Sequence, residues 1–477
     1  MQKINSPTIR KFVNFFESFL LSEKPLFDRH IQGFAYYHFI RFHFFDLLID
    51  AKKWIQKTDQ RQMAGSRQKL NIAAALIGNT VCRNWRSDTK QSDILILNSA
   101  KKVPGGNRYI DPYTSCLTDQ LSQSFTLWED PVRWRHLPHD HGSNLFYLDS
   151  LHFESKLRKT ASDHFKQDFQ NESAFLSGFA REMNLSVSAQ KIDFLIRNAF
   201  FLHAGCAKAI KNRLQRKKVK TLILVTHYVP MKMLITTIAK SLGIYVIELQ
   251  HGNMGRYHIA YNFGHTRTMT TLPDEIFTFG NFWSENTRIS ANGVRLTATG
   301  MPWFNRQSRR ISTAGHQKIR ILFLSQEVIG RQLGNLALDL VRRLNMNHYE
   351  IIYKLHPNEY MSWQKTYEPE FVNSDIRIVT KTDLYSLLGS TDIHVGVYST
   401  TVMESLIFDK MLILYESYGI HYFMDLIKSG RAFHAKNSDD LAALVKKYRK
   451  PPHTDVHYFW EADSINRMIN RINRIIA

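Results

Sequence analysis

The sequence predicts an α/β protein made of two facing domains, each a parallel sheet with helices on both faces, preceded by a helical extension. Three observations support this fold class. From Asp93 onward, short apolar runs alternate with helical patterns, as in parallel sheets. A polar tract at residues 305–318 interrupts the series and indicates a link between domains. Two apolar runs end in histidine motifs, Gln250-His251-Gly252 and Lys354-Leu355-His356-Pro357.

Composition and charge limit the class of protein. The chain has 477 residues, of which 44% are apolar and 22% charged, so we expect several folded domains rather than disorder. The formal net charge of +21 indicates an anionic partner. Nucleic acid, anionic lipid headgroups, phosphorylated carriers and acidic polysaccharides all satisfy that requirement.

The cysteines and the apolar segments bear on location. Cys82, Cys116 and Cys206 are widely spaced, which argues against a disulfide framework or a zinc site and fits a reducing compartment. The first residues lack the pattern of a signal peptide, and no uncharged apolar run reaches about 18 residues. We therefore expect a cytoplasmic protein, with peripheral attachment to the inner membrane face as an extension of that expectation.

Residues 1–92 form the predicted helical extension, residues 93–304 the first Rossmann-like domain and residues 305–477 the second. The extension is rich in aromatic residues at helical spacing. It is either a cap whose aromatic stripe is core, or an interfacial helix that docks on lipid. The polar face of its first helix is not strongly basic, which favours the cap.

The predicted elements follow the alternation of apolar runs and helical patterns. In the first domain, strands are expected at 93–97, 144–148, 218–226, 244–249 and 275–279, with helices at 174–213 and 231–242. In the second domain, strands are expected at 319–324, 349–353, 376–379, 393–396 and 411–415, with helices at 335–344 and 401–408.

Three strand ends of the second domain carry polar motifs. Because the carboxyl ends of parallel strands share one edge, we expect these motifs to lie together. Free N–H groups and hydroxyls at the start of the 401–408 helix suit an anion, although plain N-capping also explains such residues. The candidate donor-binding residues are Ser325, Gln326, Lys354, His356, Pro357, Ser399, Thr400, Thr401 and Glu404, the last toward a ribose.

These motifs resemble a known family. Lys354-Leu-His-Pro357 and Tyr398-Ser-Thr-Thr-Val-Met-Glu-Ser-Leu406 resemble the nucleotide-donor motifs of GT-B glycosyltransferases that build bacterial capsules and surface polysaccharides. That group includes sialyltransferases, Kdo transferases and CDP-glycerol glycerophosphotransferases. Gln250-His-Gly252 resembles the His-Gly motif of their N-terminal domain, and the similarity covers residues 93 to about 450.

The resemblance implies a transferase that moves a sugar or polyol phosphate from a nucleotide-activated donor, CMP- or CDP-linked among the candidates. No cofactor and no metal are implied, and the chain has no Asp-x-Asp motif after a strand. The acceptor would be a lipid-linked or polymeric surface glycan, as in capsule or lipopolysaccharide synthesis. His356, Ser399 and Thr400 would hold the donor phosphate.

The sequence leaves the catalytic base open. His251 is one candidate, because a histidine near neutral pKa can deprotonate an acceptor hydroxyl. Glu248, inside an apolar strand, and Asp111, before Pro112, are carboxylate alternatives. Arg256 and Tyr257, just after the His-Gly motif, are candidates for gripping an acidic acceptor.

Two other functions compete with the transferase. A nucleotide-sugar 2-epimerase shares the fold, but it needs several carboxylates around the sugar ring. A basic nucleic-acid-binding protein would agree with the charge, yet no zinc-finger, RRM or helix-turn-helix pattern is present. We therefore expect a nucleotide sugar, and not nucleic acid, as the partner.

Overall fold

The computed structural model describes residues 6–52, 83–98, 102–105, 108–131, 136–137, 144–159, 163–308, 317–327, 329–408, 410–417, 419–449 and 455–477. Cys82 and the polar stretch 57–69, which the sequence predicts as surface or connector, lie outside these residues.

The first domain is built on a seven-stranded sheet in the order β5-β4-β1-β6-β7-β8-β9, with every neighbouring pair parallel. Its strands are β1 (Ile94–Leu97), β4 (Phe125–Glu129), β5 (Leu145–Tyr147), β6 (Thr221–Val225), β7 (Tyr245–Leu249), β8 (Glu275–Thr278) and β9 (Arg295–Ala298). Three central strands, β1, β6 and β8, are buried at every residue, because helices cover both faces of the sheet. A small antiparallel pair, β2 (Val103–Gly105) and β3 (Arg108–Ile110), stands apart from it.

The second domain contains a six-stranded parallel sheet in the order β12-β11-β10-β13-β14-β15. Counted within the domain, this order is 3-2-1-4-5-6, the doubly wound order of nucleotide-binding α/β domains. The strands are β10 (Ile319–Leu324), β11 (Tyr349–Lys354), β12 (Arg377–Val379), β13 (Ile393–Gly396), β14 (Met411–Tyr415) and β15 (Phe433–Ala435).

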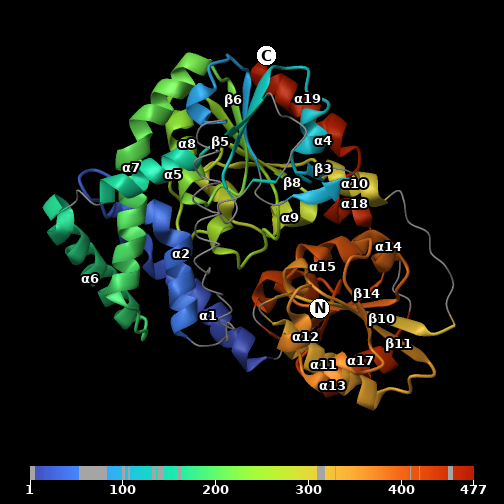
Figure 1. Cartoon of the computed structure of the whole chain (residues 1–477). Coiled ribbons are helices and arrows are strands. Elements are labelled where there is room, and N and C mark those ends of the chain that lie inside the picture. Colours follow the sequence, from blue (N-terminus) through green and yellow to red (C-terminus); the bar gives the residue numbers. More distant parts are fainter. Residues whose placement is uncertain are drawn as a thin grey trace.

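Helices cover both sheets, as Figure 1 shows. Those of the extension and first domain are α1 (Pro7–Ser22), α2 (Tyr36–Ala51), α4 (Ser115–Thr118), α5 (Asp149–Lys159), α6 (Lys166–Glu182), α7 (Ala189–Lys217), α8 (Pro230–Ser241), α9 (Asn281–Glu285) and α10 (Pro302–Ser308). The remaining helices are α11 (Gly330–Arg343), α12 (Trp363–Thr366), α13 (Pro369–Val372), α14 (Leu384–Gly389), α15 (Thr400–Glu404), α16 (Met424–Lys428), α17 (Ser438–Lys446), α18 (Val456–Phe459) and α19 (Ser464–Ile476).

Short 3₁₀ turns complete the chain. They are η1 (Lys24–Asp28), η2 (Trp85–Ser87), η3 (Asp163–Phe165), η4 (Ile259–Tyr261), η5 (Ile289–Asn292), η6 (Pro357–Glu359), η7 (Ser405–Phe408) and η8 (Ile420–Phe423).

The N-terminal helices pack on the protein itself. The apolar stripe of α1 is buried, with Phe16 and Phe19 fully enclosed, and Leu21 is its one strongly exposed large apolar residue. In α2, Arg41 forms a buried ion pair with Glu23 at 2.6 Å and donates to the backbone oxygen of Asn262 at 2.8 Å. The arrangement is that of a cap, because the stripe that lipid would need is covered by protein.

The chain returns to the first domain at its C-terminal end. Helix α19 lies against α4 and α10 (Figure 1), and Arg471 pairs with the buried Glu275 of β8 at 2.8 Å. The indole N–H of Trp283 in α9 donates to the backbone oxygen of Phe459 at 2.8 Å. Residues 455–477 therefore pack with the first domain, although the chain order attaches them to the second.

The predicted fold class, two α/β domains with parallel sheets preceded by N-terminal helices, is confirmed. The domain boundaries at 92/93 and 304/305 stay a prediction. The long helix expected at 174–213 is two helices, because Asn184 adopts a left-handed conformation (φ 58°) after α6 and Ser188 precedes α7. Across the described parts of the chain, no helix has the length and apolar character needed to cross a bilayer.

Candidate active site

His251 follows β7 at the carboxyl edge of the first sheet. The backbone oxygen of His251 accepts a hydrogen bond from the Tyr113 hydroxyl at 2.8 Å, and its Nε2 atom lies 3.1 Å from the Tyr228 hydroxyl. The side chain of Gln250 bridges the strands beside it, accepting from Phe279 N at 2.7 Å and donating to Gly252 O at 2.7 Å. The half-buried imidazole is thus fixed at its backbone and at its ring.

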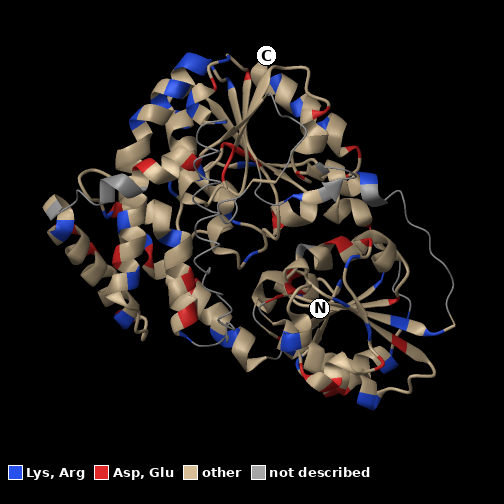
Figure 2. Cartoon of the chain, viewed as in Figure 1, with Lys and Arg blue, Asp and Glu red and all other residues tan. Residues whose placement is uncertain are grey.

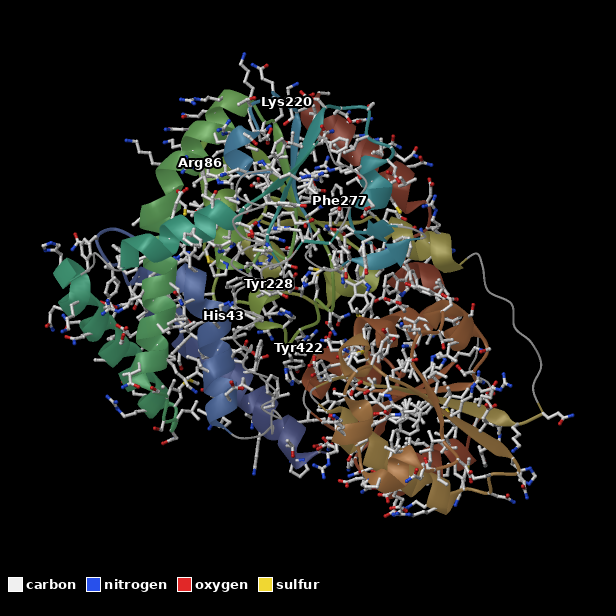
Figure 3. The ribbon with its side chains drawn as sticks, viewed as in Figure 1. His43, Arg86, Lys220, Tyr228, Phe277 and Tyr422 are labelled. Carbon is white, nitrogen blue, oxygen red and sulfur yellow. The ribbon has the colours of Figure 1, made fainter. Side chains whose placement is uncertain are left out.

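Tyr228 lies at the centre of the site. Its ring stacks on Phe42 of α2 at 4.6 Å, and Figure 3 shows it between His43 of the extension and Tyr422 of the second domain. Burial, and then the charge of Glu248, raises the pKa of the Tyr228 phenol. The phenol therefore keeps its proton near neutral pH, and its hydroxyl shares a hydrogen bond with Nε2 of His251.

A second histidine, His227, lies beside the first and was not predicted from the sequence. Its Nδ1 is 2.6 Å from Oε2 of Glu248, and its backbone N–H donates to Oε1 at 3.1 Å. The Tyr261 hydroxyl also donates to Oε1 at 3.0 Å. Glu248 is fully enclosed, and protein groups occupy both of its oxygens. This placement orients His227, so we do not retain Glu248 as a base for an acceptor hydroxyl.

The sequence contained a signal for His227. It follows strand β6 as His251 follows β7, and strand ends of parallel sheets carry functional side chains. Thr226 lies between the end of β6 and His227, and its φ is 69°. This left-handed conformation costs a β-branched residue free energy.

Across the interface, Glu404 of α15 faces the same region. Burial raises the pKa of its carboxyl to about 7, against the opposing hydrogen bond from Tyr385. Burial, followed by the charge of Glu404, raises the pKa of Tyr113, the residue whose hydroxyl bonds His251. Glu404 and His251 therefore belong to one neighbourhood, connected through Tyr113.

The predicted phosphate motif forms the start of α15. Ser399 is the N-cap residue, and its hydroxyl accepts from Thr401 N at 3.2 Å, which is the plain capping role. Thr400 is the first residue of the helix. The motif lies at the end of β13, next to the central strand β10 where the strand order reverses.

His356 is the N-cap of η6. Its Nδ1 accepts from Asn358 N at 3.3 Å, and its backbone N–H donates to Oε2 of Glu359 at 2.7 Å. Pro357 is exposed at the first position of that turn, and Gln326 is half-buried after β10. The expected meeting of the His356 and His251 imidazoles stays a prediction.

Ser325 and Lys354 are committed to protein partners. The Ser325 hydroxyl lies 3.1 Å from that of Tyr367. The ammonium of Lys354 donates to Leu355 O at 3.0 Å and to the Tyr360 hydroxyl at 2.6 Å, and burial lowers its pKa to about 8. Both side chains are turned into the protein, so we assign neither a contact with the donor.

The turn between β10 and α11 is filled from within. The Tyr367 hydroxyl donates to Oε1 of Glu359 at 2.6 Å, and the Tyr353 hydroxyl donates to Gly330 O at 2.9 Å. A Cβ atom on Gly330 would lie 2.0 Å from Oε1 of Glu359 and 2.3 Å from the Tyr367 hydroxyl. The start of α11 is therefore occupied by a carboxylate of the protein.

Asp111 and Tyr257 also have structural surroundings. Oδ1 of the buried Asp111 accepts from Tyr113 N at 2.9 Å and Thr114 N at 3.2 Å, which fixes the turn into α4. Tyr257 is buried against Phe12 and Phe16 of α1, and its hydroxyl accepts from Lys428 at 3.3 Å. Neither placement offers a group to an acceptor, whereas the side chain of Arg256 is exposed.

The loop after His251 is bonded to the second domain. The Asn253 amide donates to Tyr422 O, and Arg256 N donates to Oδ2 of Asp425 at 2.9 Å. Between them, Gly255 has no room for a side chain, because a Cβ atom would lie 2.9 Å from that same oxygen. Residues 253–256 and 422–425, which we call the interdomain latch, hold the carboxyl edges of the two sheets together.

The described residues contain no cluster of three or more His, Cys, Asp or Glu side chains arranged to hold a metal ion.

No family model matches the chain, and no curated protein sequence matches it. Among solved structures, the chain is similar to UDP-GlcNAc 2-epimerase from Methanocaldococcus jannaschii, with 10% identity and a TM-score of 0.46 over 80% of this chain and 99% of that one. Acinetobacter baumannii MurG gives 10% identity and 0.46 over 80% and 99%. A glycosyltransferase from Rickettsia africae gives 14% and 0.37 over 57% and 79%. Likeness at this level does not distinguish one activity from another.

Proposed function

We propose that the chain is a glycosyltransferase that moves a sugar, or a polyol phosphate, from a nucleotide-activated donor to a surface-glycan acceptor. The observation that carries the proposal is the pairing of two carboxyl edges across the interdomain latch. One edge brings His251, Tyr228 and Tyr113, and the other brings Glu404 on the helix that Ser399 caps. Ligands of open α/β sheets bind at such edges.

In the proposed donor site, the start of α15 and the imidazole of His356 hold the phosphate of the nucleotide. The backbone N–H groups of the first turn carry partial positive charge, and His356 donates a hydrogen bond. Glu404 accepts from a ribose hydroxyl when ionised and donates when protonated, since its pKa of about 7 allows both forms near neutral pH.

In the proposed reaction, His251 removes the proton of the acceptor hydroxyl as that oxygen attacks the anomeric carbon. The new oxygen–carbon bond forms while the bond from the anomeric carbon to the donor phosphate breaks. The nucleotide leaves with the electron pair of that bond, and its negative charge stays at the start of α15. In this step Nε2–H of His251 donates to the Tyr228 hydroxyl, which positions the imidazole and leaves Nδ1 to take the proton. The exposed Arg256 meets an acidic acceptor.

The division of labour is tested with two histidine variants. We expect His356→Ala to abolish the thermal stabilisation given by the preferred nucleotide among CMP, CDP, UDP and GDP. We expect His251→Ala to keep that stabilisation within about twofold in Kd and to lower turnover of the matching sugar donor by about 10²–10⁴-fold, the usual contribution of a general base.

The exposed His348, which precedes the opposite end of β11, supplies the control variant His348→Ala. It should match the unmodified protein in both measurements. Equal loss of nucleotide binding in the His251 and His356 variants would contradict the proposal.

Glu404 also keeps a second candidate open, a nucleotide-sugar 2-epimerase. A carboxyl with a pKa of about 7 in the candidate active site can move a proton at a sugar carbon. The product separates the two functions. A transferase releases free nucleotide in proportion to glycosylated acceptor, whereas an epimerase returns an isomeric nucleotide sugar and needs no acceptor.

A further inference from the structure

One stretch of the chain concentrates positive charge and contains no compensating acidic residues. Residues 194–247 contain ten Lys or Arg residues and no Asp or Glu. Most of these cations lie in the C-terminal half of α7 and the turn that follows it. Figure 2 shows Lys and Arg gathered at that end of the molecule.

Contacts between three segments assemble these cations into one surface. The ammonium of Lys217 donates to Lys90 O at 2.7 Å, Ser92 N donates to Lys217 O at 3.2 Å, and Lys220 N donates to Asp93 O at 2.9 Å. Figure 3 places Lys220 and Arg86 at this same end. We call the exposed cations there the α7 basic surface, which comprises Lys90, Lys208, Lys211, Arg216, Lys218 and Lys220.

Little of this charge is neutralised. Lys220 lies 3.6 Å from Asp93, and both are substantially exposed, so that pair is weak. The structure records no ion pair for the other five members with any described residue. Lys217 and Arg213 are not counted in this surface, because both bind Asp88. Lys217 pairs with the buried Asp88 carboxylate at 2.7 Å, and Arg213 donates to Asp88 O at 2.8 Å.

The α7 basic surface lies at the opposite end of the first sheet from the candidate active site. It surrounds the starts of β1 and β6, whereas His251 and His227 follow the ends of β7 and β6. A partner bound there does not compete with a substrate at the strand ends, so the surface serves attachment.

We propose that the α7 basic surface docks the protein on an anionic phospholipid surface. Five of its six cations are lysines, and the sixth is Arg216. A lysine acts as a point charge, which suits separate lipid headgroups. The guanidinium of Arg213 is used by backbone oxygens, and Trp85, the ring beside it, is buried and so not open for a base to stack on. These features fit lipid headgroups and disfavour nucleic acid.

The test uses the full chain and sedimentation with vesicles at 0.15 M salt. We expect binding to phosphatidylcholine vesicles that contain about a third phosphatidylglycerol, and none to pure phosphatidylcholine. Because each lysine near an anionic membrane contributes close to fivefold in affinity, the triple variant Lys208→Gln, Lys211→Gln, Lys218→Gln should bind about a hundredfold more weakly.

A matched control removes the same charge elsewhere, through Lys365→Gln, Lys446→Gln and Lys447→Gln on exposed positions of the second domain. It should bind vesicles within about threefold of the unmodified protein. The lipid proposal would be overturned by equal loss of vesicle binding in both triple variants, or by undiminished binding to neutral vesicles. It would also be overturned if the first triple variant lost binding to duplex DNA but kept its binding to anionic vesicles. Nucleotide stabilisation is expected to be unchanged, so this test does not depend on the proposed transferase.

Discussion

At the scale of single residues, Glu404 is the side chain whose surroundings change its chemistry most usefully. It is held between Tyr385 and the region of Tyr113, where burial disfavours the ionised form and raises its pKa to about 7. Its Oε2 atom is buried without a protein partner. A carboxyl in that state suits a site whose ligand supplies the missing hydrogen bond.

Replacing Glu404 by Gln should stabilise the protein above pH 7. The Glu404 carboxyl releases its proton near pH 4.5 in the unfolded chain and near pH 7 in the folded protein. The free energy of unfolding therefore declines as pH rises from 4.5 to 7. We expect Glu404→Gln to be more stable by about 1–2 kcal/mol at pH 8 and equal to the unmodified protein at pH 4. Urea unfolding at both pH values measures this.

The exposed Glu182 at the end of α6 provides the comparison, and Glu182→Gln should show no such difference. A pH-independent effect of Glu404→Gln would contradict the expected titration.

Sequence patterns found some residues of the site and missed others for a physical reason. His251 and Ser399 follow strongly apolar strands, so the rule for parallel sheets pointed to them as candidates, and Glu404 lies in the helix that Ser399 caps. Tyr113 and Tyr228 were missed because their role depends on one hydrogen bond each to His251. Ser325 and Lys354 follow the same rule as His251, but their side chains turn inward, and strand position does not fix that orientation.

At the scale of elements, the interdomain latch determines where the His251 loop lies. The loop begins at the end of β7 and contacts η8 and α16 through Asn253 and Arg256. Burial raises the pKa of Asp425, the acceptor for Arg256 N. Because both partners are loop or short-helix residues, small changes there alter the position of His251 relative to Glu404.

Gly255→Ala should open the latch. The added Cβ would lie 2.8 Å from Oδ1 of Asn253 and 3.1 Å from Tyr422 O, so one side must move. We expect a loss of about 1–3 kcal/mol in stability and faster hydrogen exchange at the Arg256 amide. Chemical denaturation and exchange mass spectrometry check both effects.

Gly178→Ala in α6 is the matched control, because its Cβ would meet only the Arg181 guanidinium at 3.7 Å. It should leave the exchange of Arg256 unchanged and raise helix stability slightly. Slow exchange of Arg256 in the Gly255 variant would show that the loop tolerates the methyl group.

The prediction of elements succeeded where apolar runs were continuous. Strands β1, β6, β10 and β14 are such runs. The bounds of β10 and β14 match the expected ranges, and those of β1 and β6 differ by one to three residues. Strand β4 was missed because Thr126 and Glu129 leave no continuous apolar run in its sequence Phe-Thr-Leu-Trp-Glu, although the strand is almost entirely buried. Its Glu129 is stabilised there by Lys102 at 2.7 Å and His136 at 2.8 Å.

At the scale of the whole molecule, α1 joins both domains. The Ser6 hydroxyl donates to Glu416 of the second domain at 2.6 Å, and Phe12 stacks on His421 at 3.9 Å. On its other side, Arg288 of the first domain pairs with Glu17 at 2.8 Å. Helical spacing of aromatic residues predicted α1 as a helix, but it does not state which domain a helix packs against. The packing of α1, and both the existence and the packing of α19, had to come from the structure.

The free energy of unfolding should fall in acid because of two buried histidines, His258 and His421. Burial lowers the pKa of His258 and of His421 to about 3, so these rings are neutral in the folded protein. The unfolded chain binds protons near pH 6.5 and the folded chain does not, so stability is lost as pH falls below 6.5. At pH 5 the loss is roughly 2 kcal/mol for each histidine.

His421→Phe keeps a ring against Phe12 and removes the titration. Between pH 7.5 and pH 5, we expect the free energy of unfolding to fall by about 2 kcal/mol less in this variant than in the unmodified protein, as measured by urea unfolding. The exposed histidine variant His348→Gln should follow the unmodified protein. An unchanged acid loss in His421→Phe would mean that other groups cause it.

The filled turn after β10 has a consequence for the kind of small molecule that this fold admits. The strand order 3-2-1-4-5-6 is shared with domains that bind NAD or FAD, whose pyrophosphate lies against the first glycine-rich turn. Here Glu359 and Tyr367 stand at Gly330, where that pyrophosphate would lie, and a carboxylate repels it. A redox dinucleotide is therefore excluded from the usual pyrophosphate position, and the proposed nucleotide donor would place its phosphate at the start of α15 instead.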